Sequence, residues 1–469
     1  MLRLPDRPFL SPLVHLANNP VSFIGVLLAT TGGVAWFFVL PVQLRGIETN
    51  PYVGILFFLV FPAVFFLGLT LIPLGIYLRL RLERKWGTYP QQYPPANWQN
   101  PEFRRLVVFI GLATAANVVI GGHFTYSAVS YMDSVNFCGQ SCHTVMKPEF
   151  TAYQDSPHFR VNCTACHIGE GASWFVKSKL SGVRQVFAVM LNTYSRPIPT
   201  PVHDLRPARE TCEACHWPGK FGGYRLRILN KYAEDDQNTA TKTVLLMRIG
   251  GGEMIAGIHG VHLGTGVTIE YLSDPSRQTI PWVRYVNGAG QAAEYVVKDF
   301  KPEDRNKLDR RVMDCLDCHN RPSHAFELPE QAVDRALSAG RLPVSLPAIK
   351  KEAVRILRIE YKSAAEAEKG IPVALAQTYP DRAPDVQKAA RALLDIYNRN
   401  VFPEMKINWG TYPNNIGHTY FPGCFRCHDE QHANPAGKAI TQDCNTCHQL
   451  LAAEEAKPEI LSKLGVESP

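Results

Sequence analysis

The pentapeptide Cys163-Thr-Ala-Cys166-His167 contains the pattern that decides the fold: two cysteines separated by two residues and followed at once by a histidine. A wider copy, Cys138-Gly-Gln-Ser-Cys142-His143, has three residues between its cysteines. All 12 cysteines of the 469-residue chain fall into six such pairs, so none is left over. The remaining four motifs are Cys212/Cys215/His216, Cys315/Cys318/His319, Cys424/Cys427/His428 and Cys444/Cys447/His448.

Each motif supplies the groups that attach haem c. Two cysteines at this spacing can form both thioether bonds, and the next histidine can reach the iron from the same side. Zinc ribbons use such pairs two at a time and do not need the histidine, and disulfide frameworks do not repeat tight pairs in this way. The sequence therefore predicts six covalently bound haem c groups.

Three apolar stretches without charged residues precede the motifs, at about 21–44, 53–78 and 106–129. Each is long enough to cross about 30 Å of hydrocarbon as a helix. The first is too long for the apolar part of a signal peptide, and no small-residue cleavage site follows it. We therefore expect a retained anchor of three transmembrane helices.

The orientation of this anchor follows from its basic residues. The segment between the second and third stretches carries Arg79, Arg81, Arg84, Lys85, Arg104 and Arg105. The positive-inside rule then places this segment and the N-terminus in the cytoplasm. Everything after about residue 130 is expected in the periplasm of a bacterium, where haem c is attached, with the anchor in the inner membrane.

The first motif leaves its iron ligand open. Met146 lies three residues beyond His143, and a methionine thioether can bind haem iron and raise its potential. Simple packing of Met146 is an equally good interpretation. Either His143 or Met146 is therefore expected as the proximal ligand of the first haem.

Second iron ligands are expected among the histidines outside the motifs. His15 is excluded because it is predicted to be cytoplasmic. Histidines near a motif are favoured, and these are His158, His203, His324, His418 and His432. His259 and His262 are weaker candidates, and one of them is expected to reach a haem. Irons with two histidine ligands suit electron transfer rather than substrate binding.

The fold class is expected to be mainly α with sparse secondary structure. The predicted parts are a cytoplasmic N-terminus (1–20), the transmembrane anchor (21–129), a triple-haem domain (130–235), a β-rich insertion without motifs (236–305) and a C-terminal triple-haem domain (306–469). Turn signals predict strands at 243–249, 266–272, 282–286 and 293–297. Good helix formers favour helices around 331–338, 348–357 and 384–397.

The formal charge of +7 is weak support for nucleic-acid binding, because the basic residues are scattered. Six haems would add about twelve propionates and bring the charge to roughly −5. No nucleic-acid partner is expected.

The stretch from Cys138 to His216 resembles the NapC/NirT family of membrane-bound periplasmic cytochromes, which oxidise quinol and feed periplasmic reductases. The shared features are a helix entering a first motif with a downstream Met146, then Ser156-Pro157-His158, then the second motif. The whole chain looks most like the larger inner-membrane members from metal-reducing bacteria. The segments 314–324 and 409–428 fit that likeness.

The resemblance implies roles for several residues. Met146 would be the ligand of the first haem, and His158 would be a distal ligand. A lysine about a dozen residues after the second motif lines the quinol pocket in this family, and Lys179 fits better than Lys177. A lysine bound to lipid headgroups is the plainer alternative for Lys179.

The proton acceptor for quinol stays open. The family has an aspartate six or seven residues after that lysine, but this chain has Arg184 and Gln185 in the same neighbourhood. His123 is a second candidate, because ionisable groups inside membrane segments are more often functional than not. It could take a quinol proton or bind the first haem, or it could simply bond the backbone at the membrane edge.

The leading hypothesis is a quinol dehydrogenase-type hexahaem cytochrome that takes electrons from quinol, expected to be menaquinol, and passes them to periplasmic cytochromes or reductases. One alternative is an electron-transfer subunit of a larger respiratory complex whose quinone site lies in another subunit. A second is a haem enzyme with an open coordination position at the first haem. Reduction by quinol would separate the first two, and carbon monoxide binding without loss of a native ligand would favour the third.

Overall fold

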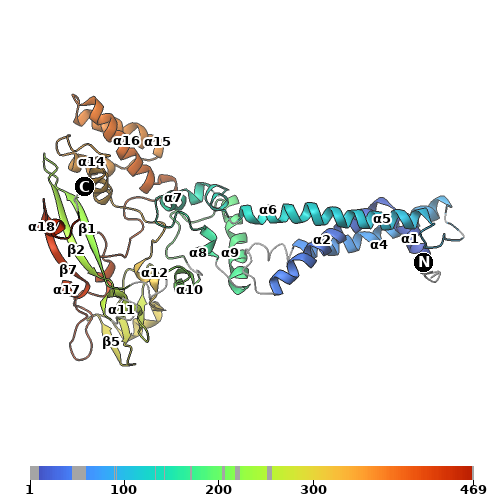
Figure 1. Cartoon of the computed structure of the whole chain (residues 1–469), viewed down its shortest axis with the longest axis horizontal. Helices are drawn as coiled ribbons and strands as arrows, with labels where there is room; N and C mark the ends of the chain where they lie inside the picture. The colour runs from blue at the N-terminus through green and yellow to red at the C-terminus, as the bar shows by residue number, and fades with distance from the viewer. Residues whose placement is uncertain are drawn as a thin grey trace. The chain divides into compact units, whose positions relative to one another are not determined.

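The computed structural model describes residues 10–44, 60–88, 90, 92–132, 134–141, 143–168, 172–202, 206–216, 222–250 and 256–466 (Figure 1). The chain divides into two compact units. The first unit contains Met1–Ser141 and Asn162–Phe187, and the second contains Cys142–Val161 and Ala188–Pro469. The boundary between the units therefore cuts through the first haem motif.

The first unit is helical. Helices α2, α4 and α5 run alongside one another in Figure 1, and the short helix α1 contacts α4 and α5. A π-helical turn, η2, joins α5 to α6. The bounds are α1 Leu10–Ala17, α2 Pro20–Leu44, α4 Phe61–Trp86, α5 Pro101–Ala116, η2 Asn117–Gly121, α6 Gly122–Met132 and α8 Cys163–His167. Helix α9, Ala172–Met190, begins in this unit and ends in the second.

Small residues bring α2 and α4 into close contact. A Cβ added at Gly25 would lie 2.8 Å from the carbonyl oxygen of Gly68, and one added at Gly68 would lie 2.4 Å from the backbone nitrogen of Ala29. The hydroxyl of Ser22 also donates to the carbonyl oxygen of Ile72, at 3.1 Å. Close approach through small residues is typical of helix pairs in membranes.

The predicted crossings are found only in part. Among the described helices, α4 by itself is long and apolar enough to span a membrane, and residues 11–17 and 20–35, bent by 97° at the break, pass the same test as a pair. The third stretch, 106–129, lies on the helical path formed by α5, η2 and α6. Residues 53–59 of the second stretch lie outside the described residues. Three crossings therefore stay a prediction.

The second unit contains two antiparallel sheets. The first has the order β1-β2-β7, with β1 Tyr224–Tyr232, β2 Ala240–Arg248 and β7 His448–Glu455. The second has the order β5-β4-β3-β6, with β3 Thr268–Ser273, β4 Trp282–Val286, β5 Ala292–Val296 and β6 Asp309–Val312. The four predicted strands correspond to β2, β3, β4 and β5. They are divided between the sheets, because β2 pairs with a strand from the end of the chain.

The other elements of the second unit are short helices and one larger helical group. The short ones are α7 His143–Gln154, α10 Ala208–Cys212, α11 Gly257–Leu263, α12 Cys315–Cys318, α17 Cys444–Cys447 and α18 Glu459–Lys463, with 3₁₀ turns η5 Pro302–Lys307, η6 Pro403–Met405 and η7 Gly423–Arg426. The mixture of helices with smaller sheets confirms the coarse fold class. The five-part division of the chain stays a prediction.

The largest hydrophobic core belongs to four helices that carry no haem motif. These are α13 Pro329–Ser338, α14 Ile349–Leu357, α15 Ala364–Thr378 and α16 Ala383–Asn400. Their fully buried side chains include Ile356, Ile371, Leu375 and Leu393. Helices α13, α14 and α16 match the predicted ones. The sequence did not indicate α15, which contains Pro372.

Candidate haem sites

Four motifs share one backbone arrangement. In each, the N–H of the histidine donates to the carbonyl oxygen of the first cysteine, four residues earlier. The pairs are His216 and Cys212 (2.7 Å), His319 and Cys315 (2.8 Å), His428 and Cys424 (3.1 Å), and His448 and Cys444. This is the bond of a helical turn, in which residues i, i+3 and i+4 share one face. Both sulfurs and the imidazole can therefore approach one haem from the same side.

The motif cysteines differ in how far the protein covers them. Cys215 of the third motif, predicted to attach a haem, is exposed, although its N–H is held by the carbonyl oxygen of Cys212 at 3.2 Å. Three other motif cysteines are exposed as well: Cys166, Cys424 and Cys444. Cysteine is ordinarily among the most buried residue types, so the protein core does not account for these positions. An accessible sulfur is what a thioether bond to haem needs, and the attachment role of Cys215 stays a prediction.

The turn of the fourth motif, α12, is fixed by a capping box. The Asp314 side chain accepts from the N–H of Leu316 (2.8 Å), and the Asp317 carboxylate accepts from the N–H of Asp314 (2.7 Å). Asp317 is buried and also accepts from the Tyr271 hydroxyl. Burial raises the pKa of Asp317, and the Arg277 guanidinium lies 3.7 Å from its carboxylate.

The first motif begins on a π-helical turn, η3 (Phe137–Ser141). A π turn takes in one more residue than an α turn, which suits the wider spacing between Cys138 and Cys142. Cys142 lies outside the described residues, and so does the side chain of His143. Met146 lies on α7 and is half-buried. The choice between His143 and Met146 therefore stays open.

Four motif histidines each face a histidine from elsewhere in the chain. The distances between ring centroids are 5.8 Å for His158 and His216, 6.3 Å for His259 and His319, 5.9 Å for His262 and His428, and 6.2 Å for His418 and His448. Because an imidazole nitrogen binds such metals at about 2 Å, two rings on opposite sides of one iron have centroids roughly 6 Å apart. The four pairs therefore have the spacing that a haem iron with two histidine ligands requires.

Hydrogen bonds orient several of these rings. The Nδ1 atoms of His262 and His428 lie 2.7 Å from the carbonyl oxygens of Ile258 and Thr441, respectively. Nδ1 of His158 lies 3.2 Å from the carbonyl oxygen of Pro322. A ring that donates from Nδ1 to a carbonyl keeps a lone pair on Nε2, which is the usual arrangement of a metal-binding histidine.

Burial also favours the neutral form of four of the paired histidines. It lowers the pKa of His259, His262, His319 and His448 below the ordinary value. Only the neutral imidazole has a lone pair for a metal, so the shift favours iron binding.

Two other predicted ligands lie in different surroundings. His432 is buried, with Nδ1 2.8 Å from the Asp429 carboxylate and Nε2 2.5 Å from the carbonyl oxygen of Ile280. Both of its nitrogens therefore face protein oxygens. Nδ1 of His324 lies 3.0 Å from the Glu149 carbonyl oxygen, the same arrangement as in the paired histidines.

The structure describes His203, Lys179 and His123 to different extents. His203 lies outside the described residues. Lys179 lies on α9, but its side chain is outside the described part, and His123 is exposed on α6. Their roles in quinol oxidation therefore stay predictions.

Hydrogen bonds and electrostatic interactions between motif cysteines indicate which motifs are neighbours. Within the second unit, a hydrogen bond with Cys212 lowers the pKa of Cys315 to about 7, and Cys424 interacts electrostatically with both Cys318 and Cys447. The third, fourth, fifth and sixth motifs are therefore neighbours in that order. Within the first unit, a hydrogen bond with Cys138 lowers the pKa of Cys163 to about 7, which places the first and second motifs together.

Buried arginine nitrogens indicate an acidic ligand that the protein itself does not supply. Among the described residues, buried guanidinium nitrogens without a hydrogen-bond partner include Nε of Arg196, Arg248 and Arg311 and Nη2 of Arg321. Nη1 of Arg399 also has no hydrogen bond, but it lies 3.8 Å from the Glu327 carboxylate. Buried N–H groups are almost always paired. Haem propionates would supply the missing acceptors, so the residues present fit the group that the motifs imply. Scattered arginines gave no sign of this role in the sequence.

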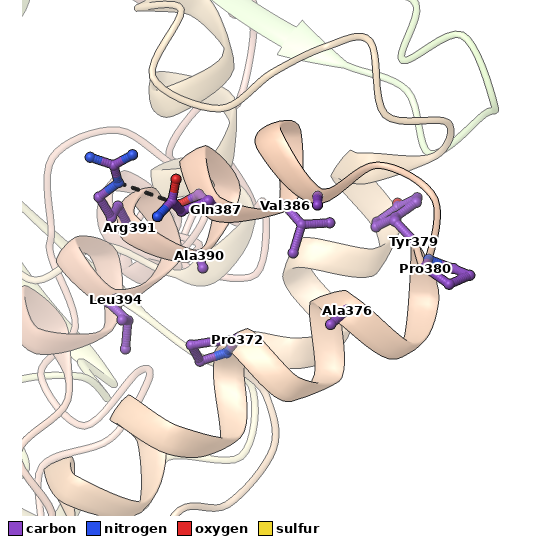
Figure 2. A pocket seen from close by; sticks show the side chains of 10 residues that line it. Pro372, Ala376, Tyr379, Pro380, Val386, Gln387, Ala390, Arg391 and Leu394 are labelled. Atoms are coloured by element: carbon purple, nitrogen blue, oxygen red, sulfur yellow. Dashed lines mark hydrogen bonds between the residues drawn. The ribbon is translucent and has the colours of Figure 1, made fainter.

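A pocket lies between α15 and α16 (Figure 2). It has a volume of about 550 Å³ and contains neither cysteine nor histidine in its lining. Its residues are Pro372, Ala376, Tyr379, Pro380, Ala383, Val386, Gln387, Ala390, Arg391 and Leu394. In the part of the chain that the structure describes, no group of three or more His, Cys, Asp or Glu side chains forms a site for a bare metal ion. The haem motifs are therefore the candidate functional sites of the described residues.

Comparisons with known proteins agree with this chemistry. Residues 101–198 match the family model described as the N-terminal region of the NapC/NirT cytochrome c family. The chain is 42% identical over 448 residues to the cytochrome c-type protein ImcH of Geobacter sulfurreducens. The aligned region covers 92% of this chain and 88% of that relative. No solved structure matches the chain. The family resemblance inferred from the motifs is confirmed.

Proposed function

Because the chain belongs to the NapC/NirT cytochrome c family, we propose that it takes electrons from a quinol in the bacterial inner membrane and passes them to periplasmic acceptors. In this proposal the six motifs hold six haem c groups, and menaquinol is the expected quinol. The acceptors are periplasmic cytochromes or reductases.

The observation that carries this proposal is the set of four histidine pairs. Their spacing fits an iron with protein ligands on both sides, at the third, fourth, fifth and sixth motifs. A haem iron with protein ligands on both sides can exchange electrons but has no open coordination position for a substrate. The pairs therefore favour an electron relay over a haem enzyme.

The chain's own residues hold and tune the relay. Each bound haem supplies one-electron redox chemistry at its iron. The motif cysteines fix the haems, and the paired histidines present neutral nitrogens from both sides. Buried arginines such as Arg321 and Arg311 would donate hydrogen bonds to propionates.

Quinol oxidation is proposed near Lys179 and His123. Both residues lie within the segment that matches the family, on α9 and α6. The Lys179 ammonium would donate a hydrogen bond to one quinol oxygen, and His123 would accept a proton from the quinol. Overall, one quinol gives one quinone, two electrons that enter the haems singly, and two protons that leave to the periplasm.

The proposed topology has the N-terminus in the cytoplasm and the haem motifs in the periplasm. The basic residues at the end of α4 and the start of α5 support it, because such residues favour the cytoplasmic side. The close, small-residue packing of α2 against α4 supports a membrane location for this region.

Anaerobic stopped-flow of the detergent-solubilised protein with a reduced menaquinone analogue tests the proposal. We expect fast haem reduction in the native protein and at least tenfold slower reduction in Lys179→Ala. Lys177→Ala, on the same helix, is the matched control, and its haems should be reduced at the native rate. Dithionite should reduce all three proteins fully.

Failure of quinol to reduce the native protein, with normal reduction by dithionite, would overturn the proposal. The quinone site would then belong to a partner subunit, and the chain would be the haem subunit of a larger complex. Equal slowing by both lysine variants would remove Lys179 from the quinol site.

A further inference from the structure

We propose that helix α11 supplies the distal ligands of two successive haems, His259 to the haem of Cys315/Cys318 and His262 to the haem of Cys424/Cys427, and so joins them into one continuous relay. This inference rests on the proposed function only in requiring that the motifs bind haem c. It concerns a segment for which the sequence indicated no role beyond one weak ligand.

The placement of the two rings carries the inference. His259 and His262 are three residues apart on α11, so both point from the same side of the helix. The His259 ring lies 6.3 Å from that of His319, and the His262 ring lies 5.9 Å from that of His428. One short helix thus faces the proximal histidines of two different motifs.

The hydrogen bonds of the second pair engage Nδ1 of both rings. Nδ1 of His262 bonds the Ile258 carbonyl oxygen, and Nδ1 of His428 bonds the Thr441 carbonyl oxygen, each at 2.7 Å. Both rings therefore keep Nε2 for the iron, and the carbonyls hold their orientation.

Backbone contacts hold α11 against the end of β2. The N–H of His259 donates to the carbonyl oxygen of Ile249, at 2.8 Å. Gly250 and Gly257 both have positive φ, and a Cβ added at Gly250 would lie 1.9 Å from the carbonyl oxygen of Ala256. Only glycine permits this close approach, which fixes the two histidines relative to the sheet.

Contacts between the motif helices agree with the histidines about which motifs are neighbours. Helix α10, which ends at Cys212, contacts α12 of the fourth motif, and α17 of the sixth motif contacts α11. Two irons bound by residues three apart on one helix must also carry adjacent haems, because such side chains begin about 5–6 Å apart. The remaining pairs, His158 with His216 and His418 with His448, extend the relay at its two ends. The relay therefore runs through the third to sixth haems in the order of the sequence.

Low-temperature EPR of the oxidised full-length protein tests the assignment. His259→Ala and His262→Ala should each give a high-spin ferric signal integrating to one haem in six, and the double variant should give two. Mass spectrometry should still find six haems attached. Added imidazole should restore the low-spin signal, and Val261→Ala, between the two histidines, should leave the spectrum unchanged.

Two further variants cover the case in which an alanine variant does not fold. His259→Met and His262→Met keep an iron ligand, and each should add one methionine–histidine haem with its own charge-transfer band and a raised potential. Low-spin spectra without a new band in all four single variants would overturn the inference. Absence of haem at the fourth or fifth motif would instead overturn the haem assignment on which the proposed function rests. The EPR spectra do not depend on quinol, so a protein that quinol fails to reduce should still give the expected spectra.

Discussion

Arg321 shows how a single side chain can prepare a place for an acidic group. Its side chain is 7% exposed and stacks on Tyr412, with the guanidinium carbon 4.0 Å from the ring centroid. One nitrogen, Nη1, lies 3.4 Å from the Glu149 carboxylate, whereas the buried Nη2 has no hydrogen-bond partner. A propionate would complete the hydrogen bonds of this guanidinium.

Arg321→Gln should therefore lower the reduction potential of one haem. A buried positive charge favours the reduced iron, and its loss should cost on the order of 1 kcal/mol, or roughly 50 mV for one electron. Potentiometric titration of the haem absorbance measures this shift. Arg341→Gln, an exposed arginine on the helical group, is the control and should leave all potentials in place. An unchanged titration for Arg321→Gln would remove this residue from the haem surroundings.

The residue scale also shows the limit of sequence reasoning about ligands. The spacing of cysteines and histidines was enough to identify all six motifs. Nearness to a motif favoured His432 and gave less weight to His262, yet His262 faces a motif histidine and His432 faces two oxygens. The path of the backbone between two histidines decides whether both can bind the same iron. That path depends on the Gly250 and Gly257 contacts, which no local pattern indicates.

At the scale of elements, helices α13 to α16 form a core that is independent of the haem motifs. A buried ion pair joins α13 to α14: Nζ of Lys350 lies 2.6 Å from Asp334 and also donates to the carbonyl oxygen of Glu330, at 2.7 Å. The exposed fraction of both side chains is small, 4% for Lys350 and 10% for Asp334. Removing one partner leaves the other charge buried and uncompensated.

Lys350→Ala should destabilise this helical group by about 3–5 kcal/mol. Denaturant unfolding followed by far-ultraviolet circular dichroism measures the loss. Lys351→Ala, an exposed neighbour, should cost little, and the haem spectra of both variants should match the native one because no motif lies in this group. Equal stability of the two variants would contradict the expected importance of the ion pair.

The strands were easier to locate than to pair. Turn residues marked four of them, since glycine and Asp-Pro segments end each apolar run. Strand β2 pairs with β1 and with β7, which begins at His448, the histidine of the sixth motif. A strand that starts on a haem motif has no strand signal of its own before the fold forms. Pairing between segments so far apart is decided by tertiary contacts.

For the whole molecule, the membrane topology gives a prediction for living cells. Alkaline phosphatase, which is active only in the periplasm, should be inactive when fused after residue 92 and active when fused after residue 466. Green fluorescent protein should show the opposite pattern. Activity of phosphatase at both positions would place the segment between α4 and α5 in the periplasm, opposite to the proposed cytoplasmic side. The basic residues at the end of α4 and the start of α5, on either side of that segment, make this outcome unexpected.

The four histidine pairs have a mechanical consequence for the whole chain. Each iron would cross-link two distant segments, as His262 and His428 illustrate, and so close a large loop. In the chain-entropy description, a cross-link that closes a loop of this kind stabilises the folded chain by about 3–5 kcal/mol. Unlike a disulfide bond, an iron–histidine cross-link is not broken by thiol reductants. The protein would therefore keep its shape in the reducing conditions under which an electron carrier must operate.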